Sequence, residues 1–352
     1  MKMSHHATAS GYDRLVDYLD SQSVPQFLEN RTLRKGVAWA AAHWCERSGS
    51  QWYSRDHALL ELDVAVEWRR TTAQVFHFLY GENCYRYAKQ LTRGSRKANA
   101  MIATYHTPPN RFADVVANPE HIRDLDAVVL MSNSQRPAFE NLIDSSCIHV
   151  VRHGVDTAYF CPAEPVSCEN QKLVDLQELP QPITFICAGR MLRDYDTLAA
   201  AVAALAKNSV PVQFQILAPR EIAEKFAGMK NVECLQGVTD DQLKLLYQSA
   251  DSLVMPMHDC TANNVLLEGM ASGLPVVATD LEGVRDYVNQ DCADLVEKHD
   301  ANGLAAAIER MASDSERRDK MARASRAQAL ELDWAKIAEQ TEGVYKTVLR
   351  QI

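Results

Sequence analysis

The 352-residue chain lacks the features that mark membrane, secreted and disulfide-rich proteins. No apolar run approaches the roughly 20 residues that a membrane-spanning helix needs. The opening residues, MKMSHHATASGYDR, lack the apolar stretch of a secretory signal. The nine cysteines are an odd number, are scattered and contain no CxxC pair. This usage argues against a disulfide framework or a zinc site, and we expect reduced thiols in a cytoplasmic protein.

A basic excess is also missing. The net charge is −9; residues 1–165 hold 18 basic and 18 acidic side chains, and the remaining residues hold 19 and 28. A nucleic-acid-binding protein more often shows a basic excess with interleaved aromatic residues. One basic cluster is present, and it comprises Arg86, Lys89, Arg93, Arg96 and Lys97. We interpret it as a solvated helix face or, alternatively, as a contact with an anionic membrane surface or an anionic acceptor.

Short apolar strands alternate with helical stretches along the chain, which predicts α/β layers with parallel sheets. The length suits two domains, and prolines with a polar run predict a hinge near residues 160–182. The expected strands lie at 37–44, 60–68, 74–81, 100–106, 127–132, 148–154, 183–190, 212–218, 231–237, 252–256 and 275–279. Helices are expected at 197–208 and 241–250 and in the charged stretch after residue 314.

The most informative segment is DCTANNVLLEGMASGLPVVAT, at residues 259–279. It predicts a short helix with Thr261 or Asn263 as its N-cap, a left-handed Gly273 at its end, and a buried strand after Pro275. The unpaired N–H groups at such a helix start suit a phosphate. Glu268 lies about one and a half turns into the helix, where it can reach a ribose beside the phosphates. An ordinary helix–turn–strand unit with a surface Glu explains this pattern equally well.

Glu268 and the following GMASGLPVVAT resemble the donor-binding motif of family-4 retaining glycosyltransferases with the GT-B fold. The resemblance implies that Glu268 binds the nucleotide ribose. That family usually has another Glu eight residues earlier, which orients the donor sugar. This chain has Cys260 there, next to Asp259, so either residue is a candidate for the sugar contact. The resemblance also implies a diphosphate site at the backbone amides of Ala262, Asn263 and Asn264.

Two segments of the first half match the same family in order. SGYDRL, at residues 10–15, stands where relatives have a glycine-rich loop, and Gly11 would let the backbone approach the donor diphosphate or the acceptor. His106 follows the expected strand AMIATY. A His at such a position is often a packing residue, but the resemblance implies a cleft position beside the donor sugar. There, His106 would hydrogen-bond the sugar and help to stabilise the transition state.

Two segments of the second half extend the resemblance. GRMLRDYDTL, at residues 189–198, matches the start of the donor domain, where an Arg and a Lys face the diphosphate. Arg190 matches directly, and Arg193 is the cation nearest to the missing Lys; an exposed ion pair with Asp194 or Asp196 is the alternative for both. A guanidinium can bind two phosphate oxygens and offset the charge on the leaving group. Val238 would present its backbone to the nucleotide base.

Two shorter motifs are interpreted as structural. HGVD, at residues 153–156, predicts a turn at Gly154 with Asp156 capping the residues after it. Asp124-Leu125-Asp126 has the spacing of a metal-binding Asp-x-Asp motif, but it precedes an apolar strand instead of ending one. We therefore expect no metal site there.

The resemblance implies a GT-B fold, with two Rossmann-like α/β domains whose parallel sheets face a central cleft. We expect an acceptor-binding domain at 1–162, a nucleotide-sugar donor domain at 163–330, and a terminal helix at 331–352 crossing back to the first domain. The implied reaction is metal-independent, retaining transfer from a nucleoside-diphosphate sugar, with UDP preferred over GDP and ADP. The acceptor, a sugar, other small molecule, polysaccharide or lipid, is not identified. We expect a cytoplasmic enzyme, with peripheral contact at the inner membrane face as an option.

Two other functions stay open. A non-catalytic partner subunit is suggested by Cys260, and a GT-B epimerase or hydrolase would keep the donor site while using its own acids and bases. The missing G-x-G-x-x-G fingerprint argues against a dehydrogenase.

Overall fold

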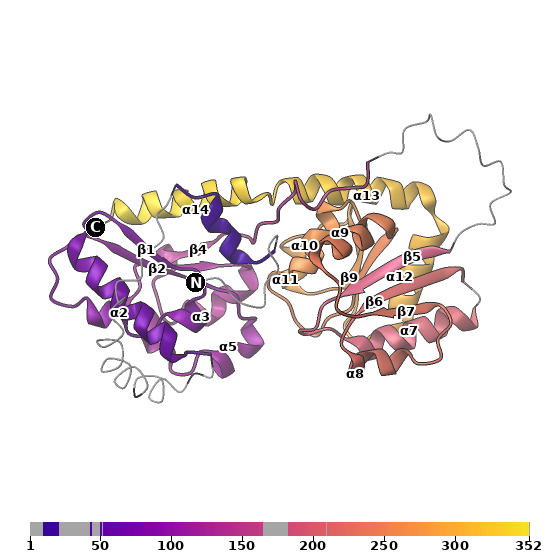
Figure 1. The fold of residues 1–352 in the computed structure, drawn as a ribbon, viewed down its shortest axis with the longest axis horizontal. Helices are drawn as coiled ribbons and strands as arrows, with labels where there is room; N and C mark the ends of the chain where they lie inside the picture. Colours follow the sequence, from indigo (N-terminus) through magenta and orange to yellow (C-terminus); the bar gives the residue numbers. More distant parts are fainter. Residues whose placement is uncertain are drawn as a thin grey trace. The chain divides into compact units, whose positions relative to one another are not determined.

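The computed structural model describes residues 10–20, 43, 50, 52–164, 182–208 and 210–351. The strand expected at 37–44 and most of the expected hinge lie outside the described residues. Contacts divide the chain into two compact units, and we describe each by itself (Figure 1). Among described residues, the first unit comprises 12–153 and 335–351, and the second comprises 10–11 and 154–334. Residues 154–162, expected in the first domain, thus group with the second unit.

The first unit is built on a parallel sheet of four strands in chain order. The strands are β1 Val75–Phe78, β2 Ala100–Tyr105, β3 Ala127–Leu130 and β4 Ile148–Val150. Every residue of β2 and β3 is buried, as expected for central strands covered on both faces. All four strands were predicted. They place their carboxyl ends, including the end of β2 before His106, along one edge of the sheet.

Apart from α2, the helices between residues 12 and 153 are short. The α-helices are α2 Arg55–Arg70, α3 Gly81–Cys84, α4 Ala88–Leu91, α5 Pro109–Val115 and α6 Arg136–Phe139. The 3₁₀ helices are η1 Tyr12–Asp17, η2 Pro119–Asp124, η3 Asn133–Gln135 and η4 Ser145–Cys147.

The strand predicted at residues 60–68 is wrong, because these residues lie inside α2. A capping box starts the helix: Oγ of Ser54 accepts from the backbone N–H of His57, and Nδ1 of His57 accepts from the backbone N–H of Ser54. Buried residues at 57, 58, 61, 64, 65 and 68 recur with the helical period. The alternating apolar residues of LELDVAVEW thus form one part of the buried face of a helix.

The second unit contains a parallel sheet of six strands in the order β10-β9-β8-β5-β6-β7. The bounds are β5 Ile183–Ala188, β6 Val212–Leu217, β7 Val232–Leu235, β8 Ser252–Met255, β9 Val276–Thr279 and β10 Ala293–Val296. The sequence predicted the first five of these strands and missed β10. That strand, ADLV, is short and partly polar.

The helices of this unit are α7 Tyr195–Lys207, α8 Arg220–Ala223, η6 Glu224–Phe226, α9 Asp240–Ser249, α10 Asn264–Ala271, α11 Glu282–Arg285, α12 Ala301–Ser313 and α13 Ser315–Leu330. Helix α7 packs against α12, and α10 packs against both β8 and α13. Side chains such as Phe185, Leu198 and Ile308 are fully buried between the sheet and α7 or α12. This core fixes the strands whose carboxyl ends carry the loops of the candidate site.

The chain ends in α14, Trp334–Leu349. Its residues from Ala335 onward group with the first unit, where Tyr345 Oη lies 2.6 Å from Nδ1 of His77. None of the helices in the described part of the chain is long and apolar enough to cross a membrane.

The predicted cap is confirmed, because Asp156 Oδ1 accepts hydrogen bonds from the backbone of Ala158 and Tyr159. The turn itself lies at residues 157–159 and not at Gly154. A Cβ on Gly154 would lie 2.3 Å from the indole of Trp334. Both residues belong to the second unit, and the adjacent Val155 forms a parallel bridge with Asp333. Glycine is therefore required here for close approach to Trp334.

Candidate functional site

The order of strands in the second unit reverses between β5 and β8. In open α/β sheets, ligands bind at the carboxyl ends of the strands at such a switch point. Here the loops after β5 and β8 are joined: Arg193 and Met257 form an antiparallel bridge, and the N–H of His258 donates to the carbonyl of Leu192 over 2.9 Å. The fold therefore brings together the two segments that the sequence assigned to diphosphate binding.

Helix α10 begins at this edge. Asn263 is its N-cap, and the Asn263 Oδ1 accepts a hydrogen bond from the backbone of Leu266, which decides between the two predicted caps. The helix ends as predicted, with Gly273 in the left-handed region at φ +85° and Pro275 before β9. Ala262, Asn263 and Asn264 are half-buried. The positive end of the α10 dipole thus faces the switch point, where an anion is stabilised.

Arg193 is buried and held by three acceptors. Its guanidinium donates to the carbonyl of Ala188 over 2.8 Å, to that of Met191 over 3.3 Å, and to Oδ1 of Asn263 over 3.0 Å. The ion pairs considered as alternatives do not form, because Asp194 bonds to Thr197 and His299, and Asp196 pairs with Lys225. The candidate cation is thus attached to the capping residue of α10.

Arg190 and Val238 occupy other loops of the second unit. Arg190 is exposed directly after β5 and Gly189, whose φ is +102°. Val238 is half-buried between Gly237, at φ +64°, and Thr239, the N-cap of α9. The side chain of Arg190 is thus accessible to a ligand, and Val238 lies between two exposed residues.

Glu268 is buried inside α10 and not on the surface. Its carboxylate accepts hydrogen bonds from the Ser10 hydroxyl and from Oη of Tyr247, the latter over 3.1 Å. Burial raises the pKa of Glu268 above its usual value, although these two bonds oppose the shift. Ser10, Gly11, Asn264 and Glu268 line one small pocket of about 10 Å³, which holds about one water molecule. The reading of Glu268 as a surface residue is therefore wrong.

Cys260 is buried, and burial raises the pKa of its thiol to about 12. Its Sγ lies 3.6 Å from the carbonyl oxygen of Thr261. The backbone carbonyl oxygen of Cys260 packs so closely against Gly283 that a Cβ added to Gly283 would lie only 1.9 Å from it. A thiol in this position does not replace the carboxylate of the family motif. Asp259 is half-buried, and its Oδ1 accepts from the backbone of Cys260 over 2.8 Å. Of the two candidates, only Asp259 offers a charged group near the surface.

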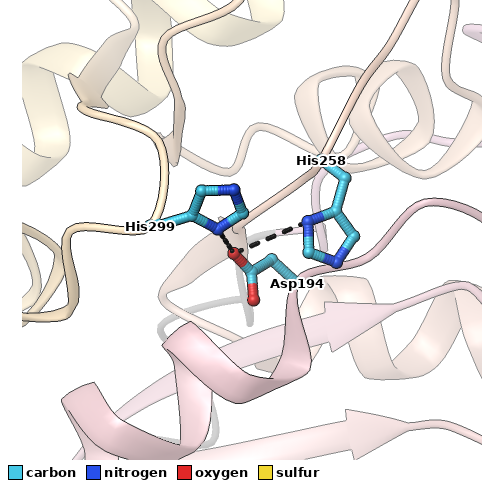
Figure 2. Close-up of side chains that lie close together, drawn as sticks. All are labelled: Asp194, His258 and His299. Carbon is cyan, nitrogen blue, oxygen red and sulfur yellow. Dashed lines mark hydrogen bonds and ion pairs between the residues drawn. The ribbon is translucent and has the colours of Figure 1, made fainter.

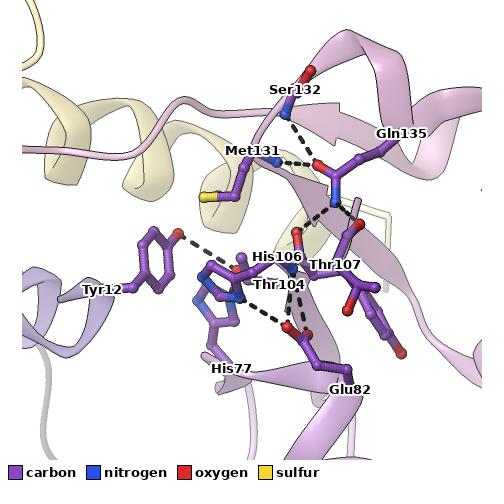
Figure 3. Close-up of polar contacts among 10 residues, drawn as sticks. Tyr12, His77, Glu82, Thr104, His106, Thr107, Met131, Ser132 and Gln135 are labelled. Carbon is purple, nitrogen blue, oxygen red and sulfur yellow. Dashed lines mark hydrogen bonds and ion pairs between the residues drawn. The ribbon is translucent and has the colours of Figure 1, made fainter. Parts of the chain in front are cut away.

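His106 lies in the first unit, directly after β2 (Figure 3). Its ring stacks on Tyr80 at a centroid distance of 4.8 Å and meets the ring of Tyr12 edge-on, also at 4.8 Å. Its Nδ1 lies 3.4 Å from Oε1 of the buried Glu82, and its backbone N–H donates to the same oxygen over 3.2 Å. The structure thus places His106 in an aromatic and carboxylate cluster that fixes the orientation of the ring.

The residues that hold His106 were not predicted from the sequence. Glu82, at the start of α3, and Tyr80, just after β1, carry no motif, and only their closeness to a strand end could have drawn attention to them. Gln135 was missed as well: its amide donates to the carbonyls of Tyr105 and Thr107, which flank His106, over 3.0 Å each (Figure 3). The strand end is therefore positioned by a buried side chain from the next loop of the sheet.

The basic cluster does not form one solvated helix face, which corrects that prediction. Arg86 is buried and donates to the carbonyl of Ala117 over 2.6 Å, and Lys89 pairs with Asp126. Helix α4 has only four residues, too few to present five cations on one side. The exposed members of the cluster are Arg93, Arg96 and Lys97. Arg93 also pairs with Asp124 at 3.3 Å.

The second unit matches a known family. Residues 182–314 fit the family model described as glycosyl transferases group 1. The D-inositol 3-phosphate glycosyltransferase of Salinispora tropica is 27% identical over 270 residues, covering 70% of this chain and 56% of that protein. The alpha-maltose-1-phosphate synthase of Mycolicibacterium smegmatis is 29% identical over 251 residues, 63% of each chain. The chain thus spans less than two thirds of the length of these curated relatives.

Solved structures match both units. HepE of Anabaena, in complex with UDP, superposes with a TM-score of 0.64 at 17% identity, covering 82% of each chain. A glycosyltransferase of Rickettsia africae superposes with a TM-score of 0.62 at 18% identity, covering 83% of this chain and 82% of that one. At these identities the likeness establishes the fold, which agrees with the two parallel-sheet units. The chain therefore has the GT-B fold, and its second unit is similar to the group 1 glycosyl transferases.

Proposed function

We propose that this protein transfers a sugar from a nucleoside-diphosphate sugar to an acceptor, with UDP as the preferred nucleotide. The observation that carries the proposal is the contact between Arg193 and Asn263, because it joins a buried guanidinium to the N-terminus of α10. Both groups attract a diphosphate, and both lie at the switch point of a parallel sheet. Support for UDP comes from HepE of Anabaena, which was solved with that nucleotide.

The chemistry depends on the charge that develops on the leaving diphosphate. Arg193 and the amides at the start of α10 are fixed before the reaction begins, so they stabilise this charge without reorganising. Arg190, exposed on the same loop, adds a second guanidinium. These cations supply the charge that a metal ion supplies in other transferases, and we therefore propose metal-independent transfer.

Glu268 is proposed to bind the ribose. In the free protein its carboxylate is occupied by the hydroxyls of Ser10 and Tyr247. A ribose hydroxyl can replace the Ser10 hydroxyl on the same oxygen, so the bond exchanged is of the same type. We expect nucleotide binding to move Ser10, because the pocket holds about one water molecule and not a ribose.

Retention of anomeric configuration and a role for His106 at the sugar are carried over from the family resemblance as proposals. Binding of the acceptor by the first unit is proposed on the same ground. The names of the curated relatives suggest inositol phosphates and maltose 1-phosphate chemistry as first acceptor trials.

A calorimetric titration with UDP, GDP and ADP, repeated on Glu268→Ala, tests the proposal. We expect one nucleotide to bind at micromolar concentration and the substitution to weaken it by about 1.5–3 kcal/mol, as for a hydrogen bond to a charged group. Tyr159→Phe is a matched control, because it removes an exposed hydroxyl bond to Asp241 elsewhere in the second unit. Absence of binding to all three nucleotides would reject the donor site.

A non-catalytic nucleotide-binding subunit is the second candidate, favoured by the burial of Cys260 where the family motif has a Glu. Product analysis separates the candidates. Sugar transfer to an acceptor supports the first, and nucleotide binding without turnover supports the second. Release or isomerisation of the donor sugar without any acceptor identifies a hydrolase or an epimerase.

A further inference from the structure

Two histidines and an aspartate that have no role in the proposed transfer meet in the second unit (Figure 2). Asp194, His258 and His299 follow β5, β8 and β10, so three strand ends of one parallel sheet bring them together. Oδ2 of Asp194 lies 2.7 Å from Nδ1 of His299 and 3.8 Å from Nδ1 of His258. One possible ligand atom from each residue lies within 4.8 Å of the other two.

These distances suit a divalent transition metal. Zinc bonds of about 2.0–2.2 Å in tetrahedral geometry place neighbouring ligand atoms roughly 3.4 Å apart. The distances from Oδ2 of Asp194 to Nδ1 of His299 and of His258 lie on either side of that value. Small side-chain rotations would therefore bring these atoms to the spacing of zinc ligands. The histidine side chains are 47% and 58% exposed, whereas Asp194 is buried. A metal here would have three protein ligands on one side and water on the other.

The carboxylate is held in place before any metal binds. As the N-cap of α7, Asp194 accepts from the backbone N–H of Thr197 at Oδ1 over 3.0 Å and from its hydroxyl at Oδ2 over 2.7 Å. Burial opposes ionisation of Asp194, but these bonds together with His299 lower the pKa of its carboxyl below the usual value. Such fixed partners orient a ligand and strengthen a metal site.

The backbone of His299 gives an independent indication. Its φ is +62°, in the left-handed region that glycine adopts most easily. A side chain retained there at a cost in backbone strain points to a function for that side chain. Here the strained residue turns its imidazole toward Asp194 and His258 (Figure 2).

We propose that Oδ2 of Asp194, Nδ1 of His258 and Nδ1 of His299 bind one divalent transition metal ion, with water completing its coordination. The proposal does not rest on the transferase function, because it concerns binding alone. The scattered cysteines argue against a zinc site made of thiolates. They give no information about ligands that contain no thiol and lie far apart in the sequence. The ion would join the loop of Arg193 to the loop that leads to Asn263, and so stabilise both.

The test is a titration of the full, metal-free chain with Zn²⁺, followed by equilibrium dialysis. His5 and His6 are neighbours in the sequence and can bind metal on their own, so both are replaced by Ala in every variant. We expect one ion per chain, with affinity reduced at least 10- to 100-fold in His258→Ala and in His299→Gly. The latter keeps the left-handed turn without strain, so folding is retained. Thr197→Val should weaken binding about tenfold by releasing Asp194.

His149→Ala is the matched control, because it removes a half-buried histidine of the first unit and should leave Zn²⁺ binding unchanged. Co²⁺ spectra report the ligands, and we expect no thiolate-to-metal band. Three results would overturn the proposal: no Zn²⁺ binding, equal binding in His258→Ala and His299→Gly to that of the parent chain, or a thiolate band showing that cysteines hold the metal.

Discussion

Arg193 donates a hydrogen bond from Nη2 to Oδ1 of Asn263 over 3.0 Å, although 70 residues separate them in the sequence. The same Asn263 oxygen caps the start of α10. One amide oxygen therefore fixes both a cation and a helix N-terminus, the two groups expected to bind a diphosphate. Substitutions at either residue should thus change nucleotide affinity, and loss of the cap at Asn263 should also lower stability.

Arg193→Lys should weaken nucleotide binding by at least tenfold, about 1.4 kcal/mol. Lysine keeps the charge but lacks the planar fork that bonds two backbone carbonyls and Asn263 at once. Calorimetry with UDP measures the effect. Arg285→Lys serves as control, because Arg285 is an exposed residue of the same unit paired with Asp280. Equal affinity in Arg193→Lys and the wild type would contradict a role for Arg193 at the diphosphate.

Asn263→Ala and Asn263→Asp should separate stability from binding. Alanine removes the cap, and we expect a loss of about 1 kcal/mol in the free energy of unfolding. Aspartate is as good a cap and pairs with Arg193, so stability should be retained. Its negative charge, however, would repel a diphosphate and weaken UDP binding. Urea unfolding and calorimetry on both variants check this, and full UDP affinity in Asn263→Asp would exclude a phosphate at this position.

His106→Ala should lower turnover by roughly 10²-fold or more while leaving UDP affinity unchanged, if His106 acts only in the transition state. Turnover of the donor and calorimetry are measured on the same sample. Glu82→Gln keeps an acceptor for the backbone N–H of His106 but removes the negative charge beside Nδ1. We expect a smaller loss of turnover in that variant. Unchanged turnover in His106→Ala would assign the residue a packing role.

Gly154→Ala should destabilise the protein by about 1–3 kcal/mol, since the new Cβ would lie 2.3 Å from Trp334. Gly343→Ala is the matched control. Nothing lies within 4 Å of a Cβ at Gly343 in the described structure, and the residue is inside α14, so we expect stabilisation of about 0.5–1 kcal/mol. Thermal unfolding of both variants measures the difference. A tolerated Gly154→Ala would mean that Trp334 moves without cost.

Glu61→Gln should change how stability depends on pH. Burial raises the pKa of Glu61 to about 7, although hydrogen bonds from Tyr53 and three backbone N–H groups oppose the shift. Between pH 4.5 and 7 the folded state thus binds more protons than the unfolded state, so the free energy of unfolding falls as pH rises.

The glutamine variant does not titrate at this position. The wild-type minus variant free energy should therefore decrease by roughly 3 kcal/mol from pH 4.5 to 7. Contributions of other groups, including His77 and His121, cancel in this difference. Urea unfolding across the range provides the measurement, and parallel curves for the two proteins would place the pKa of Glu61 near its usual value.

Much of the fold could be predicted from local pattern. Buried parallel strands read as short apolar runs, and nine of the ten strands in the described part of the chain were visible this way. Helix α10 was predictable from its cap, its terminal Gly273 and Pro275. The error at α2 arose because alternating apolar residues over a short window fit both periods. β10 was missed because half of its residues are polar or only partly buried.

Some residues of the candidate site could likewise be predicted from the sequence, and others could not. Motif residues such as Arg193, Asn263 and Glu268 could be chosen from the sequence, since their types and order resemble a family. Their partners could not. Ser10 bonds to Glu268, and Gln135 holds the strand end at His106, through contacts between distant segments that leave no local trace.

Local chemistry thus determined the alternation of strands and helices, the caps and turns, and the residue types able to bind a diphosphate, because each depends on neighbours a few positions away. Tertiary structure decided which of these residues are buried and what they contact. It buried Cys260 and Arg86, exposed Arg190, and gathered Asp194, His258 and His299. The physical reason is that parallel strands align their carboxyl ends whatever their order in the chain, so residues from separate loops become neighbours only when the sheet forms.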